Sequence, residues 1–238
     1  MIWWIISLII FSILISLLFR FTKGIVRTII TAFMLLFLLF SVLLVFAFLD
    51  AREFSQKFPT AKNGFILIDN EPKAIFLMDN GEVILPNNAE TQKYFKRYDE
   101  GALNDFYKLF IIKKSAFSNV TLVNFQEENI TAEFAWDVIY GDSTKKITEY
   151  IMEKEGIENS LFDFVGTQIA AQFGDSAKIK NTMFALLFQS ANDKDQMFIV
   201  KEYKKANIEV IPRTSLFRLV SFIPYSWIET IIKVNLNE

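Results

Sequence analysis

The sequence has no cysteine and no histidine. Without cysteine, the chain forms no disulfide and supplies no thiolate to a zinc site or an iron–sulfur cluster. Without histidine, it lacks the commonest general base and the commonest transition-metal ligand. The phosphate-binding patterns GxxxxGK[ST] and GxGxxG and the acyl-transfer pattern GxSxG are missing as well. The sequence therefore predicts no catalytic, cofactor-binding or metal-binding residues, and it favours a non-enzymatic protein over an enzyme that needs neither His nor Cys.

Acidic residues are absent from positions 1–49, which hold only Arg20, Lys23 and Arg27 as charged residues. All 27 acids lie in 50–238 beside 22 of the 25 Lys and Arg residues, so that part carries a net charge of −5. Nucleic-acid-binding proteins present a basic face to the phosphates. We therefore expect no nucleic-acid partner.

Two long apolar runs, 2–19 and 25–49, fill the region without acids. At 1.5 Å per residue, the first run covers about 27 Å, close to the roughly 30 Å core of a bilayer. The segment between them, 20–24, has room only for a tight turn. The sequence therefore predicts a transmembrane helical hairpin over 1–49, with helices at about 2–19 and 25–49, and a two-pass protein of the cell membrane whose first partner is the lipid bilayer.

Two alternatives to a plain anchor are compatible with an apolar N-terminal segment. A cleaved signal peptide needs a basic start and a small-residue cleavage site, whereas 1–4 has no cation and 18–21 reads Leu-Phe-Arg-Phe. A subunit of an oligomeric pore or transport complex is the other alternative, with Ser7, Ser12 and Ser16 facing a common axis. Small hydroxyl residues also let two membrane helices pack closely, so we expect the anchor.

Orientation follows from the positive charges near the turn. Arg20, Lys23 and Arg27 lie within eight residues, while the stretch before Ile2 has no cation. The positive-inside rule places such a turn in the cytoplasm. It predicts that the large C-terminal part is extracytoplasmic.

The remaining chain is predicted to be a juxtamembrane connector over 50–63 and one soluble α+β domain over 64–238. Turn residues at Asn80-Gly81 between apolar runs are a strong hairpin signal, and Asn87 with Glu90 forms a capping box. The predicted strands are 65–68, 74–78, 83–85, 106–112, 120–125 and 130–140, with a helix at 88–98. In 130–140 the assignment rests on the alternation of apolar and polar residues.

After Gly141 the apolar residues recur at helical spacing. Helices are predicted to begin at Asp142 or Ser143, at Ser160 with Asp163, at Asp175, at Asp193 with Gln196, and at Ser226 with Glu229, with one short strand at 208–211. Strands followed by helices favour an α+β fold. We therefore expect a mainly antiparallel sheet and a C-terminal helical half.

Three groups of residues have side chains of the types used in catalytic or metal-binding sites. Asp69, Asp79 and Glu82 suit a metal or acid–base site, but their Asp-Asn context is typical of turns. The segment 192–195 resembles the start of a calcium loop, but it lacks the glycine and the closing glutamate, so a helix cap explains it better. A serine–lysine hydrolase would use Ser55 with Lys57, or Ser115 with Lys113 or Lys114.

The stretch 213–233 is apolar but is interrupted by Arg218, Pro224, Glu229 and Lys233. It is predicted to form two short helices broken at Pro224 and packed on the sheet, with a position in the membrane interface as the alternative. Taken together, the sequence predicts a membrane-anchored, non-enzymatic domain that binds or scaffolds a protein partner or a second copy of itself. A membrane-bound hydrolase independent of His and Cys is the remaining alternative.

Overall fold

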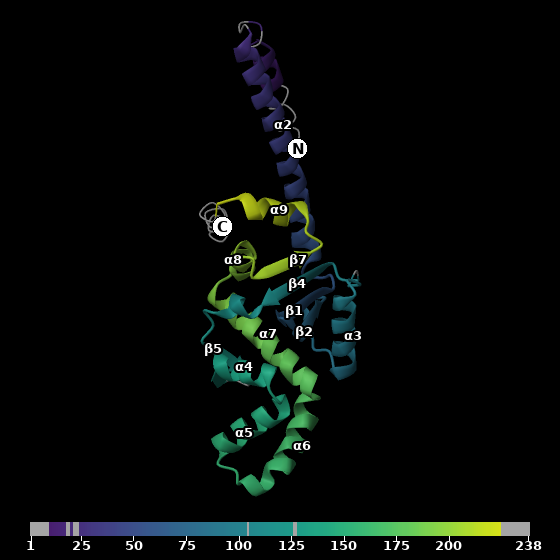
Figure 1. Cartoon of the computed structure of the whole chain (residues 1–238), viewed down its shortest axis with the longest axis vertical. Helices are drawn as coiled ribbons and strands as arrows, with labels where there is room; N and C mark the ends of the chain where they lie inside the picture. Colours follow the sequence, from purple (N-terminus) through teal and green to yellow (C-terminus); the bar gives the residue numbers. More distant parts are fainter. Residues whose placement is uncertain (1–9, 18–19, 21–23, 104, 126–127, 225–238) are drawn as a thin grey trace. The chain divides into compact units, whose positions relative to one another are not determined.

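The computed structural model describes residues 10–17, 20, 24–103, 105–125 and 128–224. The chain divides into two compact units, 1–49 and 50–238, and each is described by itself. Figure 1 shows the helices and strands with the labels used below.

The first unit contains most of one long apolar helix, α2 (Ile25–Lys57). Its side chains are largely exposed; Phe33, for example, is 73% accessible and Leu36 71%. Within the described residues, this is the one helix long and apolar enough to cross a membrane. Residues 10–17 are also helical, whereas the rest of the predicted segment 2–19 lies outside the described residues, so the two-helix hairpin stays a prediction.

The polar end of α2 extends eight residues beyond the predicted end at 49. The Phe54 ring stacks on the Phe58 ring, with 4.8 Å between the ring centroids, and it contacts the Phe217 ring edge-on, with 5.7 Å between the centroids. The Phe58 ring in turn contacts Phe110 at 5.8 Å. The first part of the predicted connector is therefore helical, and its rings belong to the core of the second unit.

A five-stranded sheet in the order β3-β2-β1-β4-β7 forms the centre of the second unit. Three of its four pairings are antiparallel, and β1 with β4 is parallel. Asn80 and Gly81 form the β2–β3 turn with positive φ, as the sequence predicts. A separate antiparallel hairpin is formed by β5 and β6. The strands are β1 (Asn63–Asp69), β2 (Glu71–Asp79), β3 (Glu82–Ile84), β4 (Lys108–Lys113), β5 (Leu122–Phe125), β6 (Glu128–Thr131) and β7 (Ile208–Ile211).

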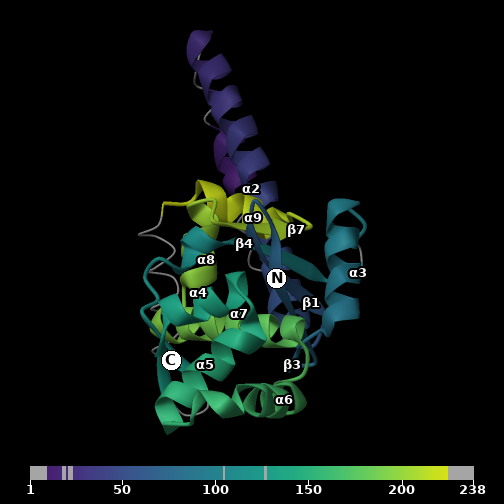
Figure 2. The same ribbon diagram turned by 60° about the horizontal axis from the view of Figure 1, so that its bottom comes forward.

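Helices cover both faces of this sheet. The helices of the second unit are α3 (Asn88–Asp99), α4 (Ala132–Tyr140), α5 (Ser143–Glu155), α6 (Phe162–Phe173), α7 (Ser176–Lys194), α8 (Phe198–Lys204) and α9 (Ser215–Phe222), with 3-10 turns η1 (Lys114–Phe117) and η2 (Asn159–Leu161). Of these, α5 and α6 pack mainly on each other and on α4 and α7 rather than on the strands. Figure 2 shows α3 on one side of the strands and α4 and α7 on the other. The α+β class is confirmed.

Alternation along the strands produces two separate apolar layers. Phe65 and Leu67 of β1 face the larger layer, which includes residues of α4, α7 and α8. Ile66, between them, faces the smaller layer against aromatic residues of α3. Because β1 is covered on both faces, its five residues from Asn63 to Leu67 are all buried.

Three phenylalanine rings cross the middle of the sheet in register. Phe65 lies opposite Phe76 on β2 and opposite Phe110 on β4. The ring centroids are 4.6 and 4.9 Å apart, and the planes differ by only 6° and 7°. Cross-strand aromatic pairs of this kind stabilise neighbouring strands.

The predicted strand 130–140 is wrong. β6 ends at Thr131, whose hydroxyl oxygen accepts a hydrogen bond from the Phe134 amide at 3.1 Å and caps α4. The buried residues of α4 are Ala132, Ala135, Val138 and Ile139. They follow the helical period of 3.6, whereas the alternation that predicted a strand ran through Phe134 and Trp136, which are only partly buried.

Two predicted helix starts are also wrong. Ser160 does not cap α6, which follows η2 and begins after Leu161 without a side-chain cap. Asp193 does not open a helix either, because α7 continues to Lys194. The next helix, α8, begins at Phe198, so the turn between them holds Asp195 rather than Asp193. The predicted helix starting at Ser226 lies outside the described residues.

Candidate functional site

A cleft of about 570 Å³ opens on the second unit. Its walls come from the β1–β2 turn, from α3, from the end of α4 and from the first turns of α7. The polar lining residues are Asn70, Glu71, Lys73, Asn88, Thr91, Gln92, Tyr98, Asp99, Tyr140, Ser176, Lys180 and Asn181.

Asn181 holds the elements of the cleft together from beneath. It is fully buried, and its amide nitrogen donates to the Pro86 carbonyl at 2.8 Å and to the Thr91 hydroxyl at 3.0 Å. Its carbonyl oxygen accepts from the Ile75 amide at 2.8 Å. One side chain of α7 therefore ties β2 and the start of α3 to the same helix.

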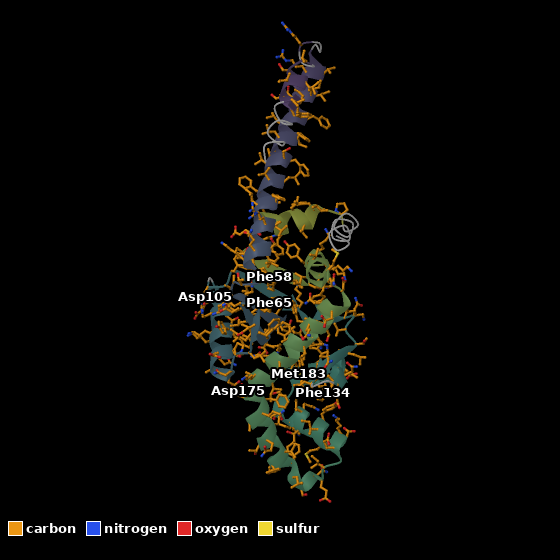
Figure 3. All side chains as sticks on the ribbon, turned by 180° about the vertical axis from the view of Figure 1, so that it is seen from behind. Phe58, Phe65, Asp105, Phe134, Asp175 and Met183 are labelled. Carbon is orange, nitrogen blue, oxygen red and sulfur yellow. The ribbon has the colours of Figure 1, made fainter. Side chains whose placement is uncertain are left out.

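Asp175 joins the beginnings of the two helices that border the cleft. One carboxylate oxygen accepts from the Lys178 amide at 2.9 Å and caps α7. The other accepts from the Asn88 amide at 2.7 Å, in the first turn of α3. Figure 3 labels Asp175 at the start of α7 and Met183 further along the same helix. The carboxylate fixes the spacing of α3 and α7 at the cleft.

Lys180, one turn into α7, brings a positive charge to the cleft. Burial lowers the pKa of its ammonium group, and the nearby Lys73 lowers it further, while Asp142 opposes both effects. Among the residues that the structure describes, no hydrogen bond or ion pair is formed by this ammonium group. Lys180 is therefore a half-buried cation without an ion-pair partner among these residues. Its charge is stabilised only by a longer-range attraction to Asp142.

Lys73, the second cation of the cleft, is already paired. Its ammonium nitrogen lies 2.5 Å from a Glu71 carboxylate oxygen and 5.7 Å from the centre of the Tyr140 ring. The Lys114 ammonium also lies over this ring, at 4.6 Å. Cations over an aromatic face are attracted by its quadrupole.

Tyr140 and Tyr98 bring hydroxyl groups to the cleft. Burial raises the pKa of Tyr140, and a hydrogen bond to the Asp69 carboxylate raises it further. Burial also raises the pKa of Tyr98, with smaller effects from Glu209 and Asp99. Both phenols are therefore neutral near pH 7 and act as hydrogen-bonding groups.

The three acidic residues singled out by the sequence do not form one cluster, because Asp69 lies apart from Asp79 and Glu82. Asp69 ends β1 and Asp79 ends the antiparallel β2, so they lie at opposite ends of the paired strands. Asp79 lies beside Glu82 across a tight turn and accepts a hydrogen bond from Asn80 at 3.3 Å. Within the described part of the chain, no group of three or more acidic residues is placed to hold a metal ion.

The segment 192–195 forms the end of α7, whereas the sequence predicted a helix beginning at Asp193. Asn192 donates to the Phe188 carbonyl at 2.9 Å within α7. The Asp195 carboxylate accepts from the Met197 amide at 3.0 Å and pairs with Lys201 at 2.5 Å. These carboxylate and amide groups are used by the chain itself.

The serine–lysine pairs considered from the sequence have other partners. Ser55 donates to the Arg52 carbonyl at 2.9 Å, and Lys57 pairs with Glu53 at 2.9 Å. Ser115 donates to Asn207 at 2.7 Å. Lys113 donates to the Ala206 carbonyl at 2.9 Å, and Lys114 lies over the Tyr140 ring. In this arrangement none of these serines is activated by its neighbouring lysine.

Sequence reasoning missed Lys73, Tyr140, Lys180 and Asn181. The cleft residues lie on elements that are far apart along the chain, and Asn181 bonds to groups 90 to 106 residues away. One signal was available: an asparagine in the middle of the apolar helix predicted to start at Asp175.

The chain matches no protein-family model, and comparisons with curated proteins and with solved structures give no significant match. The function proposed below therefore rests on the residues of the chain itself.

Proposed function

We propose that this chain is a membrane-anchored, non-enzymatic binding domain whose cleft receives an acidic segment of a protein partner. The observation that carries the proposal is the Lys180 ammonium group, half-buried at the cleft without a bonded counterion among the described residues. Desolvating an unpaired charge is unfavourable, and a bound carboxylate offsets that cost through a charge-assisted hydrogen bond.

The polarity of the cleft supports a peptide ligand. Small-molecule pockets are lined mostly by apolar and aromatic side chains, whereas this cleft has amide side chains and both signs of charge along its walls. Amide groups such as those of Asn70 and Gln92 suit the backbone of an extended segment. Lys180 supplies the point that selects an acidic side chain or a terminal carboxylate.

The anchor is the second part of the proposal. We propose that 2–19 and 25–49 form a transmembrane hairpin and that the domain after it is extracytoplasmic. Support comes from the length and apolarity of α2, from the helical residues 10–17, and from the Phe11 and Phe37 rings, whose centroids are 5.2 Å apart. The cations at 20, 23 and 27 favour a cytoplasmic turn.

Photo-crosslinking of the full chain in its native membrane tests the cleft. A photoreactive amino acid replaces Gln92, an exposed residue of the cleft wall, and Lys93 on the same helix is the matched control site. We expect a discrete crosslinked product from position 92 and not from 93, and a severalfold lower yield in the presence of Lys180→Gln. Equal products at both positions, or a yield independent of Lys180, would contradict the proposal.

Membrane anchorage and sidedness are tested separately. Carbonate washing at alkaline pH leaves an integral protein in the pellet, and release into the supernatant would rule out the anchor. Because the chain has no cysteine, Lys96→Cys on the exposed face of α3 introduces a single thiol. Labelling by an impermeant maleimide on intact cells is expected; labelling only after lysis would place the domain in the cytoplasm.

A further inference from the structure

The short helix α9 is attached to the residue at which the apolar part of α2 ends. The Leu216 amide donates to the Asp50 carboxylate at 2.6 Å. Asp50 is the first charged residue after Arg27, so it follows an uninterrupted uncharged stretch over 28–49. The beginning of α9 is thus bonded to the polar end of the apolar helix.

The inner face of α9 is fixed to the second unit. Phe217 is buried, and its ring lies 5.7 Å from Phe54 and 5.3 Å from Tyr203. At the other end of the helix, the Lys204 ammonium donates to the Val220 carbonyl at 2.9 Å and to the Ile223 carbonyl at 2.6 Å. Because both ends of α9 and its Phe217 face are bound to the second unit, the opposite face of this helix has a fixed orientation within that unit.

The outer face of α9 combines apolar and basic side chains. With 3.6 residues per turn, the residues opposite Phe217 are Ser215, Arg218, Leu219 and Phe222. Phe222 is 83% accessible, more than any other large apolar residue of the described part of the second unit, where Phe164 follows at 62%. Arg218 is exposed on the same face.

We infer that this outer face of α9 lies in the headgroup region of the bilayer, with Phe222 at the acyl boundary and Arg218 on lipid phosphate. The inference rests on the proposed anchorage by α2. Leu216 is bonded to Asp50, and Asp50 directly follows the proposed span 28–49 in the chain, so α9 begins beside the residue at which that span ends. An aromatic ring with arginine on one helix face is the composition of interfacial helices, and arginine pairs well with phosphate.

Two exposed residues that precede α9 are likewise one apolar and one basic residue. Ile211, at the end of β7, is 43% accessible, and Arg213 is exposed two residues later. Together with α9 they form a surface with two arginines and no acidic residue between 210 and 224. This charge complements anionic lipid and would repel a basic protein partner.

The test uses the full chain, reconstituted in vesicles of zwitterionic and anionic phospholipid that contain lipids with a nitroxide at the fifth acyl carbon. An environment-sensitive fluorophore is attached to one introduced cysteine: Ser215→Cys on the outer face of α9, Leu36→Cys within the apolar run, or Lys96→Cys on α3. We expect quenching at position 215 about threefold greater than at 96, and strong quenching at 36.

A second pair of variants separates lipid contact from mere proximity. In the Ser215→Cys background, Phe222→Ser with Arg218→Gln should reduce quenching at least by about half, whereas Phe164→Ser, which removes another exposed ring, should leave it unchanged. Quenching at 36 without quenching at 215 would overturn the inference and leave the anchor intact. A label at 215 that is shielded from water but not quenched would show a protein on this face and overturn it too. Absence of quenching at 36 would contradict the anchor, and the inference with it.

Discussion

At the residue scale, Asn181 shows how much of the cleft depends on one buried polar side chain. Replacing it with leucine keeps the number and branching of the side-chain heavy atoms but removes a partner from the Ile75 amide, the Pro86 carbonyl and the Thr91 hydroxyl. A buried polar group without a partner costs about 1–3 kcal/mol. We therefore expect Asn181→Leu to lower the free energy of unfolding by more than about 2 kcal/mol, measured by urea denaturation of the full chain in detergent.

Asn192→Leu is the matched control on the same helix, because Asn192 makes one hydrogen bond, to the Phe188 carbonyl. That variant should lose about 1 kcal/mol or less. Equal losses from the two variants would show that Asn181 does not connect the elements of the cleft.

Lys180 provides a second residue-scale prediction, through pH. Its folded-state pKa is lowered by burial, so the folded state disfavours the charged form. The resulting destabilisation is fully present below the folded pKa and is relieved as pH rises through that pKa towards 10.5, the ordinary pKa of lysine. Lys180→Gln should therefore be more stable than the parent at pH 7, and the difference should shrink as pH approaches 10.

Urea midpoints of the two proteins across this pH range check the prediction, and Lys178→Gln on the exposed side of the same helix is the control. A difference that grows with pH would show that the folded state favours the charged lysine.

At the scale of elements, the three aligned rings of β1, β2 and β4 hold the sheet together. Phe65 is fully buried between Phe76 and Phe110. Truncating a buried phenylalanine to alanine typically costs about 3–5 kcal/mol, and we expect a loss of this size for Phe65→Ala. Phe164→Ala, at an exposed ring of α6, should change the unfolding free energy by no more than about 0.5 kcal/mol. Thermal unfolding followed by circular dichroism measures both, and similar losses would contradict the packing described for β1.

The elements also show where sequence patterns are sufficient. The hairpin at Asn80-Gly81 and the capping box of Asn87 and Glu90 were predicted correctly because turn and cap chemistry is local. The interval 130–140 was misassigned because its apolar residues fit both periods. The helix is favoured because it buries Ala135 and Val138 in the core. The local residue pattern does not show which side chains the rest of the fold will bury.

The cleft was not predictable for a related reason. Lys178 and Lys180 are alike in sequence, two positions apart, yet only Lys180 lines the cleft. The difference comes from the packing of α7 against β2 and α3, which brings Asn181 onto partners about a hundred residues away. A sequence can predict that a helix is amphipathic, but it does not predict which of the lysines on that helix will be buried by tertiary packing.

At the scale of the whole molecule, the chain separates into an apolar unit and an acidic, mixed α+β unit at 49/50. The absence of acids before Asp50 made the apolar segment evident from composition alone. The second unit carries the cleft and the net negative charge of the chain. The proposed membrane-anchored binding domain would account for both properties, with its partner selected by a cation in the cleft of a unit whose net charge is negative.

Quantitative affinity capture from native membranes tests this account most directly. The full chain, Lys180→Gln and the control Lys178→Gln are expressed at equal levels, solubilised and compared by mass spectrometry. The account predicts one or more proteins captured equally by the parent and by Lys178→Gln, and at least about thirtyfold less by Lys180→Gln, since losing a buried charge pair at an interface costs about 2 kcal/mol or more. Equal capture by all three proteins, or capture of no protein above a tag-only control, would contradict it.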